Sequence, residues 1–259
     1  PTIATVNSHG KVSAKKPGQV EIYALNSDES VLAYCLLTVK PRLFCITWNV
    51  DNKLSTQLVY EYAELKPNIT PEKTGYTFIG WEPELPETMP SENISFTAKW
   101  EVNKYSSQFN ASGGFWENGY ATKTVKTDYG KKIIAPENPS RNGYDFAGWD
   151  VEIPSAMPAK NLAFNATWVP RNDTKYTVNT YVMNPDSSYE YSSETKYGTT
   201  DQTVALKAPD KQNGFIFNES KSVLSGNIAG DGTLVLSVYI DRENVLSTPR
   251  FIDRKKQHQ

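Results

Sequence analysis

Apolar and polar residues alternate one by one in several short segments of the chain. In residues 94–100, Ile, Phe, Ala and Trp occupy every second position, with Ser, Thr and Lys between them. Residues 162–168 repeat this pattern, and residues 234–241 alternate in a similar way. A period of two places one face of a β-strand on a core and the other in water. The pattern therefore predicts a strand in each segment.

Three pieces of sequence occur twice, and the two copies always lie 68 positions apart. They read Gly-Tyr-x-Phe-x-Gly-Trp, then Pro-x-x-Met-Pro, then Asn-x-x-Phe-x-Ala-x-Trp. The paired pieces are residues 71–81 with 139–149, 86–90 with 154–158, and 93–100 with 161–168. Self-similarity at one fixed offset is the signature of a duplicated structural module.

Each copy places a glycine inside its first predicted strand, at Gly80 and at Gly148. A glycine in a strand marks a bulge or the close approach of another group. We expect these two glycines to leave room for a neighbouring aromatic ring. Proline-rich segments flank the predicted strands and cannot continue a sheet ladder, so we expect them to form fixed loops.

The chain from Tyr176 onward has the features of a third, divergent copy. The run Gly-Phe-Ile-Phe at 214–217 occupies the place of Gly-Tyr-x-Phe, although no Gly-Trp follows it. Gly230-Asp-Gly232 precedes the alternating segment 234–241 and is a turn signal. Asp231 alone offers too few oxygens for calcium, so a plain turn is the favoured interpretation.

The composition supports several small sheets with aromatic cores. Hydrophobic residues make up 38% of the chain and aromatic residues 12%. The 27 basic and 29 acidic residues give a net charge of −2, which provides no electrostatic footprint for nucleic acid or an anionic membrane. No apolar run reaches the roughly 18 residues that span a bilayer. The chain starts at Pro1 without an apolar leader, and we expect any export signal or wall anchor to lie outside it.

Cysteine and histidine give no sign of a metal or nucleophilic site. The two cysteines, Cys35 and Cys45, are too few for a disulfide framework and lack metal-ligand spacing. We expect Cys35 to pack as a small hydrophobic residue and both thiols to be free, with a bridge between them as the less favoured alternative. His9 and His258 lie near opposite ends of the sequence.

Two pairs of carboxylates have the spacing that acid–base chemistry could use, namely Glu61 with Glu64 and Glu82 with Glu84. Neither pair has a nearby His, Lys or metal-ligand partner in the sequence, so a solvated surface is the favoured interpretation. We therefore predict no catalytic residue, no metal ligand and no cofactor-binding residue.

Six aromatic residues fall outside the apparent core faces of the repeats. Exposed aromatic rings can stack on sugars or anchor a protein partner. The alternative is that these side chains pack between neighbouring modules. The six are Trp48, Trp116, Tyr120, Tyr129, Tyr189 and Tyr191.

The signature shared by the two copies resembles the internalin B-repeat family, also called Listeria–Bacteroides repeats. The resemblance covers roughly residues 43–169. The third unit, from Tyr176 to Arg242, more loosely resembles the mucin-binding-protein-like units that follow such repeats. The opening Ile3–Gly18 resembles the second half of a group 2 bacterial Ig-like domain, and residues 1–41 are too few for a whole sandwich.

This resemblance implies an all-β, β-grasp-like fold for the repeats and a partial Ig-like β-sandwich at the start. It also implies secreted, wall-attached proteins of Gram-positive or related bacteria that serve in adhesion or as spacers. The family provides no catalytic residues to carry over.

We therefore expect a linear array of small modules. Its parts are a partial Ig-like domain at 1–41, repeat modules at 42–102 and 103–170, a divergent third repeat at 171–244, and a polar tail at 245–259.

The expected function is a non-catalytic stalk and adhesion segment of a bacterial cell-surface protein. The alternative is a glycan-binding accessory module of a larger secreted or wall-attached enzyme. The expected partners are a protein or glycan on a host or neighbouring cell, with no nucleic acid and no membrane insertion within this segment. The expected location is extracellular, at the cell surface or wall.

The serial arrangement predicts a large radius of gyration. A compact globule of this length would have a radius of gyration of about 18 Å. Modules joined by short linkers should give about 25 Å or more in small-angle scattering from the monomer. A measured value near the compact figure would rule out the serial arrangement.

Overall fold

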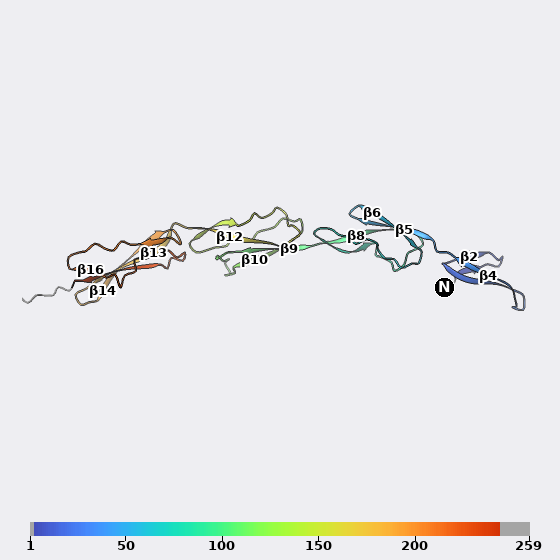
Figure 1. The fold of residues 1–259 in the computed structure, drawn as a ribbon, viewed down its shortest axis with the longest axis horizontal. Helices are drawn as coiled ribbons and strands as arrows, with labels where there is room; N and C mark the ends of the chain where they lie inside the picture. Colours follow the sequence, from blue (N-terminus) through green and yellow to red (C-terminus); the bar gives the residue numbers. More distant parts are fainter. Residues whose placement is uncertain (1–2, 244–259) are drawn as a thin grey trace, which may run out of the picture. The chain divides into compact units, whose positions relative to one another are not determined.

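The computed structural model describes residues 3–243, and these residues form strands and no helix. The expected all-β class is confirmed. Within these residues the N-terminal sheets and the first two repeat sheets each use one continuous stretch of the chain, whereas two further sheets share residues 174–242 (Figure 1). The polar tail predicted at 245–259 lies outside the described residues.

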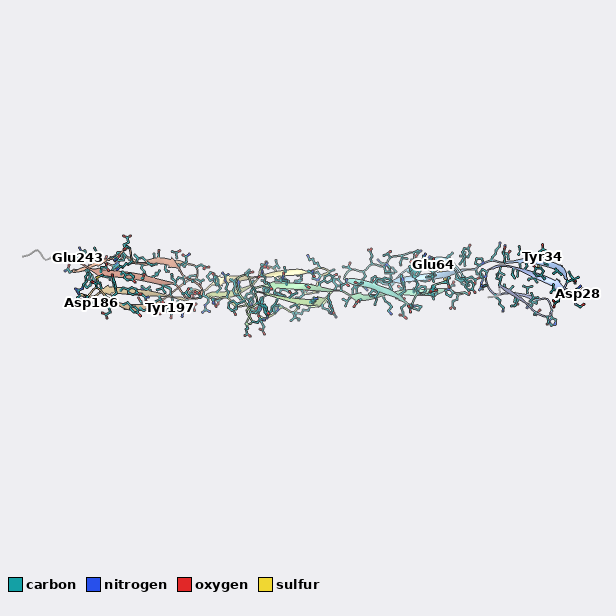
Figure 2. All side chains as sticks on the ribbon, turned by 90° about the horizontal axis from the view of Figure 1, so that it is seen from below. Asp28, Tyr34, Glu64, Asp186, Tyr197 and Glu243 are labelled. Atoms are coloured by element: carbon teal, nitrogen blue, oxygen red, sulfur yellow. The ribbon has the colours of Figure 1, made fainter. Side chains whose placement is uncertain are left out.

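The N-terminal stretch forms two small antiparallel sheets. One pairs β1 (Ala4–Val6) with β2 (Val12–Ala14), and the other pairs β3 (Gly18–Leu25) with β4 (Val31–Val39). Many apolar side chains of β3 and β4 are exposed, such as Tyr34 (Figure 2). A partial Ig-like sandwich for residues 1–41 stays a prediction.

Both cysteine side chains are free thiols, but Cys35 differs from the expectation. It lies exposed on β4 instead of packing as a small hydrophobic residue. Cys45 is partly buried on the first strand of the next module.

The first repeat is one mixed sheet of four strands in the order β6-β5-β8-β7. The two central strands, which are the first and the last of the module, run parallel, and the outer pairs are antiparallel. The strands are β5 (Leu43–Val50), β6 (Lys53–Tyr60), β7 (Tyr76–Glu82) and β8 (Ile94–Val102).

The second repeat has the same topology, in the order β10-β9-β12-β11. Its first and last strands again form a parallel central pair. The strands are β9 (Lys104–Asn110), β10 (Thr122–Asp128), β11 (Tyr144–Trp149) and β12 (Leu162–Pro170).

The third sheet follows the same plan in the order β14-β13-β18-β16, with β13 and β18 parallel. This shared topology supports a divergent copy of the repeat. The strands are β13 (Thr174–Met183), β14 (Tyr189–Gly198), β16 (Phe215–Phe217) and β18 (Val235–Arg242), with a separate pair formed by β15 (Thr203–Ala205) and β17 (Ser225–Asn227).

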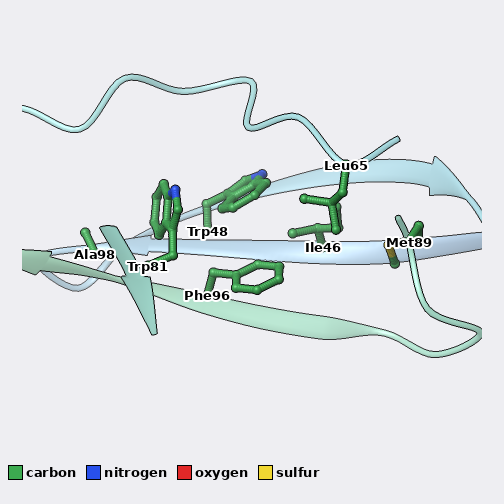
Figure 3. Packing of buried hydrophobic residues seen from close by; sticks show 7 residues of the cluster. All are labelled: Ile46, Trp48, Leu65, Trp81, Met89, Phe96 and Ala98. Carbon is green, nitrogen blue, oxygen red and sulfur yellow. The ribbon is translucent and has the colours of Figure 1, made fainter. Parts of the chain in front are cut away.

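Each repeat core is built on a stacked aromatic pair from its two parallel strands. Phe96 stacks on Trp48 with ring centroids 5.1 Å apart, and Trp81 packs beside Trp48 with centroids 4.7 Å apart (Figure 3). In the second repeat Phe164 stacks on Phe109 at 4.9 Å. Phe96 and Phe164 are fully buried, as the alternating pattern predicted.

Gly80 and Gly148 do not accommodate an aromatic ring, so that expectation is wrong. A Cβ added at either position would meet no atom within 4 Å. Both glycines instead lie at register shifts in their strand pairs, with φ of +134° and +123°. Only glycine adopts such angles readily, and the result is a β-bulge in β7 and in β11.

The described residues divide into two compact units. The first runs to Lys104 and includes Asp128–Gly130, and the second comprises Tyr105–Thr127 and the chain from Lys131 onward. The first repeat therefore belongs to the first unit, whereas the third sheet belongs to the second unit.

Candidate functional site

The first residue after the closing strand of each repeated module, which we call the linker residue, has its backbone N–H bonded in the same way in all three modules. The acceptor is the carbonyl of the glycine that opens the Gly-aromatic run. Asn103 donates to Gly75 at 2.9 Å, Arg171 to Gly143 at 2.8 Å, and Glu243 to Gly214 at 2.9 Å.

The carbonyl of the linker residue forms a second recurrent bond. It accepts a backbone N–H from the first or second residue after the following β-hairpin. The N–H of Tyr129 donates to the Asn103 carbonyl at 2.8 Å, and the N–H of Thr200 donates to the Arg171 carbonyl at 2.9 Å. In the same manner, the backbone N–H of Glu61 donates to the Arg42 carbonyl at 2.9 Å. Asn103 and Arg171 are therefore held on both sides by main-chain bonds, and we call this arrangement the clamped linker.

The clamped linkers explain two of the repeat glycines. Gly75 and Gly143 have φ of +78° and +77°, which favours glycine. A Cβ at Gly75 would lie 2.2 Å from the ring of Tyr129, and a Cβ at Gly143 would lie 2.4 Å from the Cα of Gly230. Gly214 has the same φ sign but has no atom within 4 Å of a built Cβ.

Two buried threonines complete the clamped linker at Arg171. The Thr200 hydroxyl donates to the Gly143 carbonyl at 2.8 Å. Since a hydroxyl has one hydrogen, the 2.7 Å bond between Thr174 and Thr200 must be donated by Thr174. Thr174 and Thr200 are buried, so their mutual bonding satisfies groups that would otherwise be costly to desolvate.

Charged groups surround this linker on the outside. The Tyr144 hydroxyl donates to Asp201, and this bond raises the pKa of Tyr144 above its usual value. The Arg171 guanidinium binds Asp173 through two hydrogen bonds of 2.9 and 2.6 Å, which lower the pKa of that carboxyl. These are exposed pairs, which contribute little to stability.

At the start of the first repeat Arg42 takes the place of the linker residue, and its backbone N–H donates to a side chain instead of a glycine carbonyl. Glu61 accepts the backbone N–H of Arg42 at 3.0 Å and the Arg42 guanidinium at 3.0 Å. Ser91 donates to the same carboxylate at 3.2 Å. The bonds from Arg42 lower the pKa of the buried Glu61 carboxyl. Glu61 is therefore a structural anion.

The other carboxylates of the candidate pairs lie at the surface. Glu64 forms an ion pair with Lys66 at 2.9 Å, and Glu82 forms one with Lys99 at 3.0 Å. In residues 3–243 no three His, Cys, Asp or Glu side chains gather in a way that could hold a metal. Asp231 accepts the backbone N–H and hydroxyl of Thr233, which is the plain turn expected.

Two of the six candidate aromatic residues belong to the cores, so the interpretation as exposed residues is wrong for them. Trp48 is fully buried and donates its indole N–H to Gln57 at 3.1 Å. Trp116 is 4% exposed and donates to the Glu137 carbonyl at 2.7 Å. Trp48 is matched in the second repeat by Phe109, because both stack on the phenylalanine of the closing strand.

The remaining four candidates lie in different places. Tyr120 is 64% exposed in a loop of the second repeat. Tyr129 packs edge-on against Tyr76 with centroids 5.9 Å apart, next to Gly75. Tyr189 and Tyr191 lie on β14, and the structure brings these two together with further tyrosines.

Three tyrosines form a cross-strand row on the third sheet, which we call the tyrosine row. Tyr181 is directly opposite Tyr191 on β14 and Tyr239 on β18. The rings of Tyr181 and Tyr239 stack at 4.4 Å, and those of Tyr181 and Tyr191 at 5.5 Å. The stacking covers the faces that the three rings turn toward one another. Tyr191 lies at the end of the row and is 63% exposed, so the outer face of its ring is accessible.

Comparison with known proteins decides the nature of the two repeats. Residues 44–100 and 105–176 match the model of the Listeria–Bacteroides repeat domain. Both segments are Listeria–Bacteroides repeats. The match agrees with the resemblance drawn from the repeated motifs. The mucin-binding-protein-like and Ig-like resemblances of the flanking segments stay predictions.

Two relatives cover more than half of this chain. Internalin H of Listeria monocytogenes is 27% identical over 167 residues, which is 56% of this chain and 29% of internalin H. A protein of Evansella cellulosilytica, named as a membrane protein, is 30% identical over 175 residues, 61% of this chain and 24% of that protein. The chain thus spans less than a third of either relative.

The repeats and these relatives indicate a module of a bacterial cell-surface protein. Within residues 3–243 there is no helix of the length and apolarity needed to cross a membrane.

Gly143→Ala should loosen the clamped linker at Arg171. The new methyl group would meet the backbone of Gly230 at 2.4 Å, in addition to the strain of a positive φ, which costs about 1–2 kcal/mol by itself. Hydrogen exchange should show loss of protection at the amides of Arg171 and Thr200.

The matched control is Gly214→Ala, which introduces the same φ strain without a steric clash. It should lower the melting temperature less and leave those two amides protected. Equal effects of the two substitutions would show that the close approach at Gly143 is unimportant.

Proposed function

We propose that this chain is a non-catalytic stalk and adhesion segment of a bacterial cell-surface protein. The observation that carries the proposal is the parallel pairing of the first and last strands in each repeated module. In a parallel pair both strands point the same way, so the chain enters each sheet at one end and leaves it at the other. Such a module adds length to the polypeptide path.

The clamped linkers support the same proposal. A linker fixed by main-chain hydrogen bonds on both sides has less freedom than a flexible connection of the same length. A stalk needs this property because it must hold a distal domain away from the cell.

The family membership of the repeats and the similarity to internalin H support a location outside the cell, at the surface or wall. The proposed partner is a protein or glycan on a host or neighbouring cell. We also propose the module boundaries given above, with Asn103 and Arg171 as the shared linker residues.

The surface location can be tested on intact cells that produce the full-length protein. Antibodies against residues 1–259 should label these cells, and mild protease treatment should remove the labelling. Antibodies against a cytoplasmic protein serve as the control and should label permeabilised cells only. Labelling that appears only after permeabilisation would contradict the proposal.

A glycan-binding module is the second candidate, and the exposed Tyr191 ring favours it. Tyrosine rings stack on the apolar faces of sugars. If this candidate is correct, a glycan array should show saturable binding that survives added salt and is lost in Tyr191→Ala. Tyr120→Ala is the matched control, since Tyr120 is equally exposed but lies outside the tyrosine row. Absence of saturable binding would eliminate this candidate.

A further inference from the structure

The strand β14 is an open edge of the third sheet. It pairs with β13 over ten consecutive residues, from Tyr189 to Gly198, without a register shift. Within residues 3–243 no strand pairs with its other side. Most of its residues are exposed, including Tyr197 (Figure 2). An edge of this kind presents unpaired N–H and C=O groups to another strand.

The edge strands on the opposite side of the three related sheets carry features that discourage strand pairing. The edge strands β7 and β11 contain the glycine bulges, and β16 is three residues long. Bulges and short edge strands are established ways to block edge-to-edge association. β14 has no bulge and no proline, and it is longer than the edge strands β6 and β10.

The sequence of β14 is complementary to itself in one antiparallel register. With Ser193 placed opposite Ser193 of a second copy, Glu190 lies opposite Lys196, and symmetry repeats this contact. The same register spans residues 189–197 and so uses nearly the whole strand. Opposite charges in directly opposed positions stabilise a strand pair.

The neighbouring registers are disfavoured by charge. Both copies must present the tyrosine row on the same side of the joined sheet, so odd-numbered residues must oppose odd-numbered residues. The allowed registers therefore differ by one residue in the position of the central, self-opposed residue. Centring on Ser192 places Glu190 opposite Glu194, and centring on Glu194 places this residue opposite itself. Like charges in directly opposed positions are destabilising. The register centred on Ser193 therefore lies between two repulsive ones.

The same register also pairs the aromatic residues. Tyr189 lies opposite Tyr197, and Tyr191 lies opposite Thr195 of the second copy. These residues share the face of the tyrosine row, because alternate residues of a strand point to the same side. The open side of the Tyr191 ring would then face a β-branched residue, which is a favourable cross-strand pair.

We propose that two copies of this chain associate through antiparallel pairing of β14 with β14, centred on Ser193. Lys196 is available for this contact, because its 3.3 Å ion pair with Glu194 is exposed and hence weak. A single pair of strands buries little surface, so the dimer is a weak one that forms at high local concentration.

Sedimentation equilibrium of the full chain at increasing concentration tests this proposal. The wild type should show a reversible monomer–dimer equilibrium. Lys196→Glu and Glu190→Lys each place like charges in contact and should weaken dimerisation by about tenfold or more. The double variant E190K/K196E exchanges the charges and should restore the wild-type constant to within a factor of about three.

The control is Lys126→Glu, which reverses a charge on β10, the corresponding edge strand of the second repeat. It should leave dimerisation unchanged. A chain that stays monomeric at every concentration, or a dimer that ignores both single charge reversals, would overturn the proposal.

Cross-linking tests the register independently of the charges. In a background of Cys35→Ser and Cys45→Ser, Ser193→Cys should form an intermolecular disulfide on mild oxidation, since directly opposed residues have Cα atoms within disulfide range. Ser192→Cys places the thiols diagonally, about 7–8 Å apart, and should cross-link poorly. Equal cross-linking at 192 and 193 would overturn the register.

Discussion

The parallel pairing of the first and last strands is the constraint on which the rest of each module depends. It places Trp48 beside Phe96 and Phe109 beside Phe164, so the stacked rings at the centre of each core come from segments about fifty residues apart. The middle two strands add to the outside of this pair. The same pairing sends the chain out of the sheet at the end opposite to its entry, which suits a module used in series.

The clamped linkers extend this order beyond the sheets. The glycine carbonyl at 75 or 143 receives the N–H of the linker residue, whose own carbonyl receives an N–H from the loop after the next hairpin. Where no preceding glycine is available, the carboxylate of Glu61 performs the corresponding role for Arg42. Backbone groups and one buried anion thus satisfy the polar groups of the linkers, which lie where hydrophobic burial is small.

The treatment of sheet edges differs among the modules. Glycine bulges interrupt β7 and β11, whereas β14 is long and regular. When two copies of β14 pair antiparallel about Ser193, Glu190 of each copy lies opposite Lys196 of the other. A module that only adds length to a stalk needs protected edges, because unpaired strands invite aggregation. What sets β14 apart from the corresponding edge strands β6 and β10 is its greater length and its charge pattern, and β14 also carries Tyr191 of the tyrosine row.

The sequence by itself determined the strands at 94–100, 162–168 and 234–241, the duplication and the turn at Asp231, because alternation, repetition and turn chemistry are local properties. It predicted the burial of Phe96 and Phe164 for the same reason. It misplaced Trp48 and Trp116, because neither lies in the repeated pieces of sequence and distant segments bury them. Trp48 lies opposite Phe96, and Trp116 belongs to the same buried cluster as Phe164. Only the tertiary structure decided which glycines touch another backbone, which tyrosines align and which strand edge stays open. These features depend on pairing between distant segments, and no local pattern specifies that pairing.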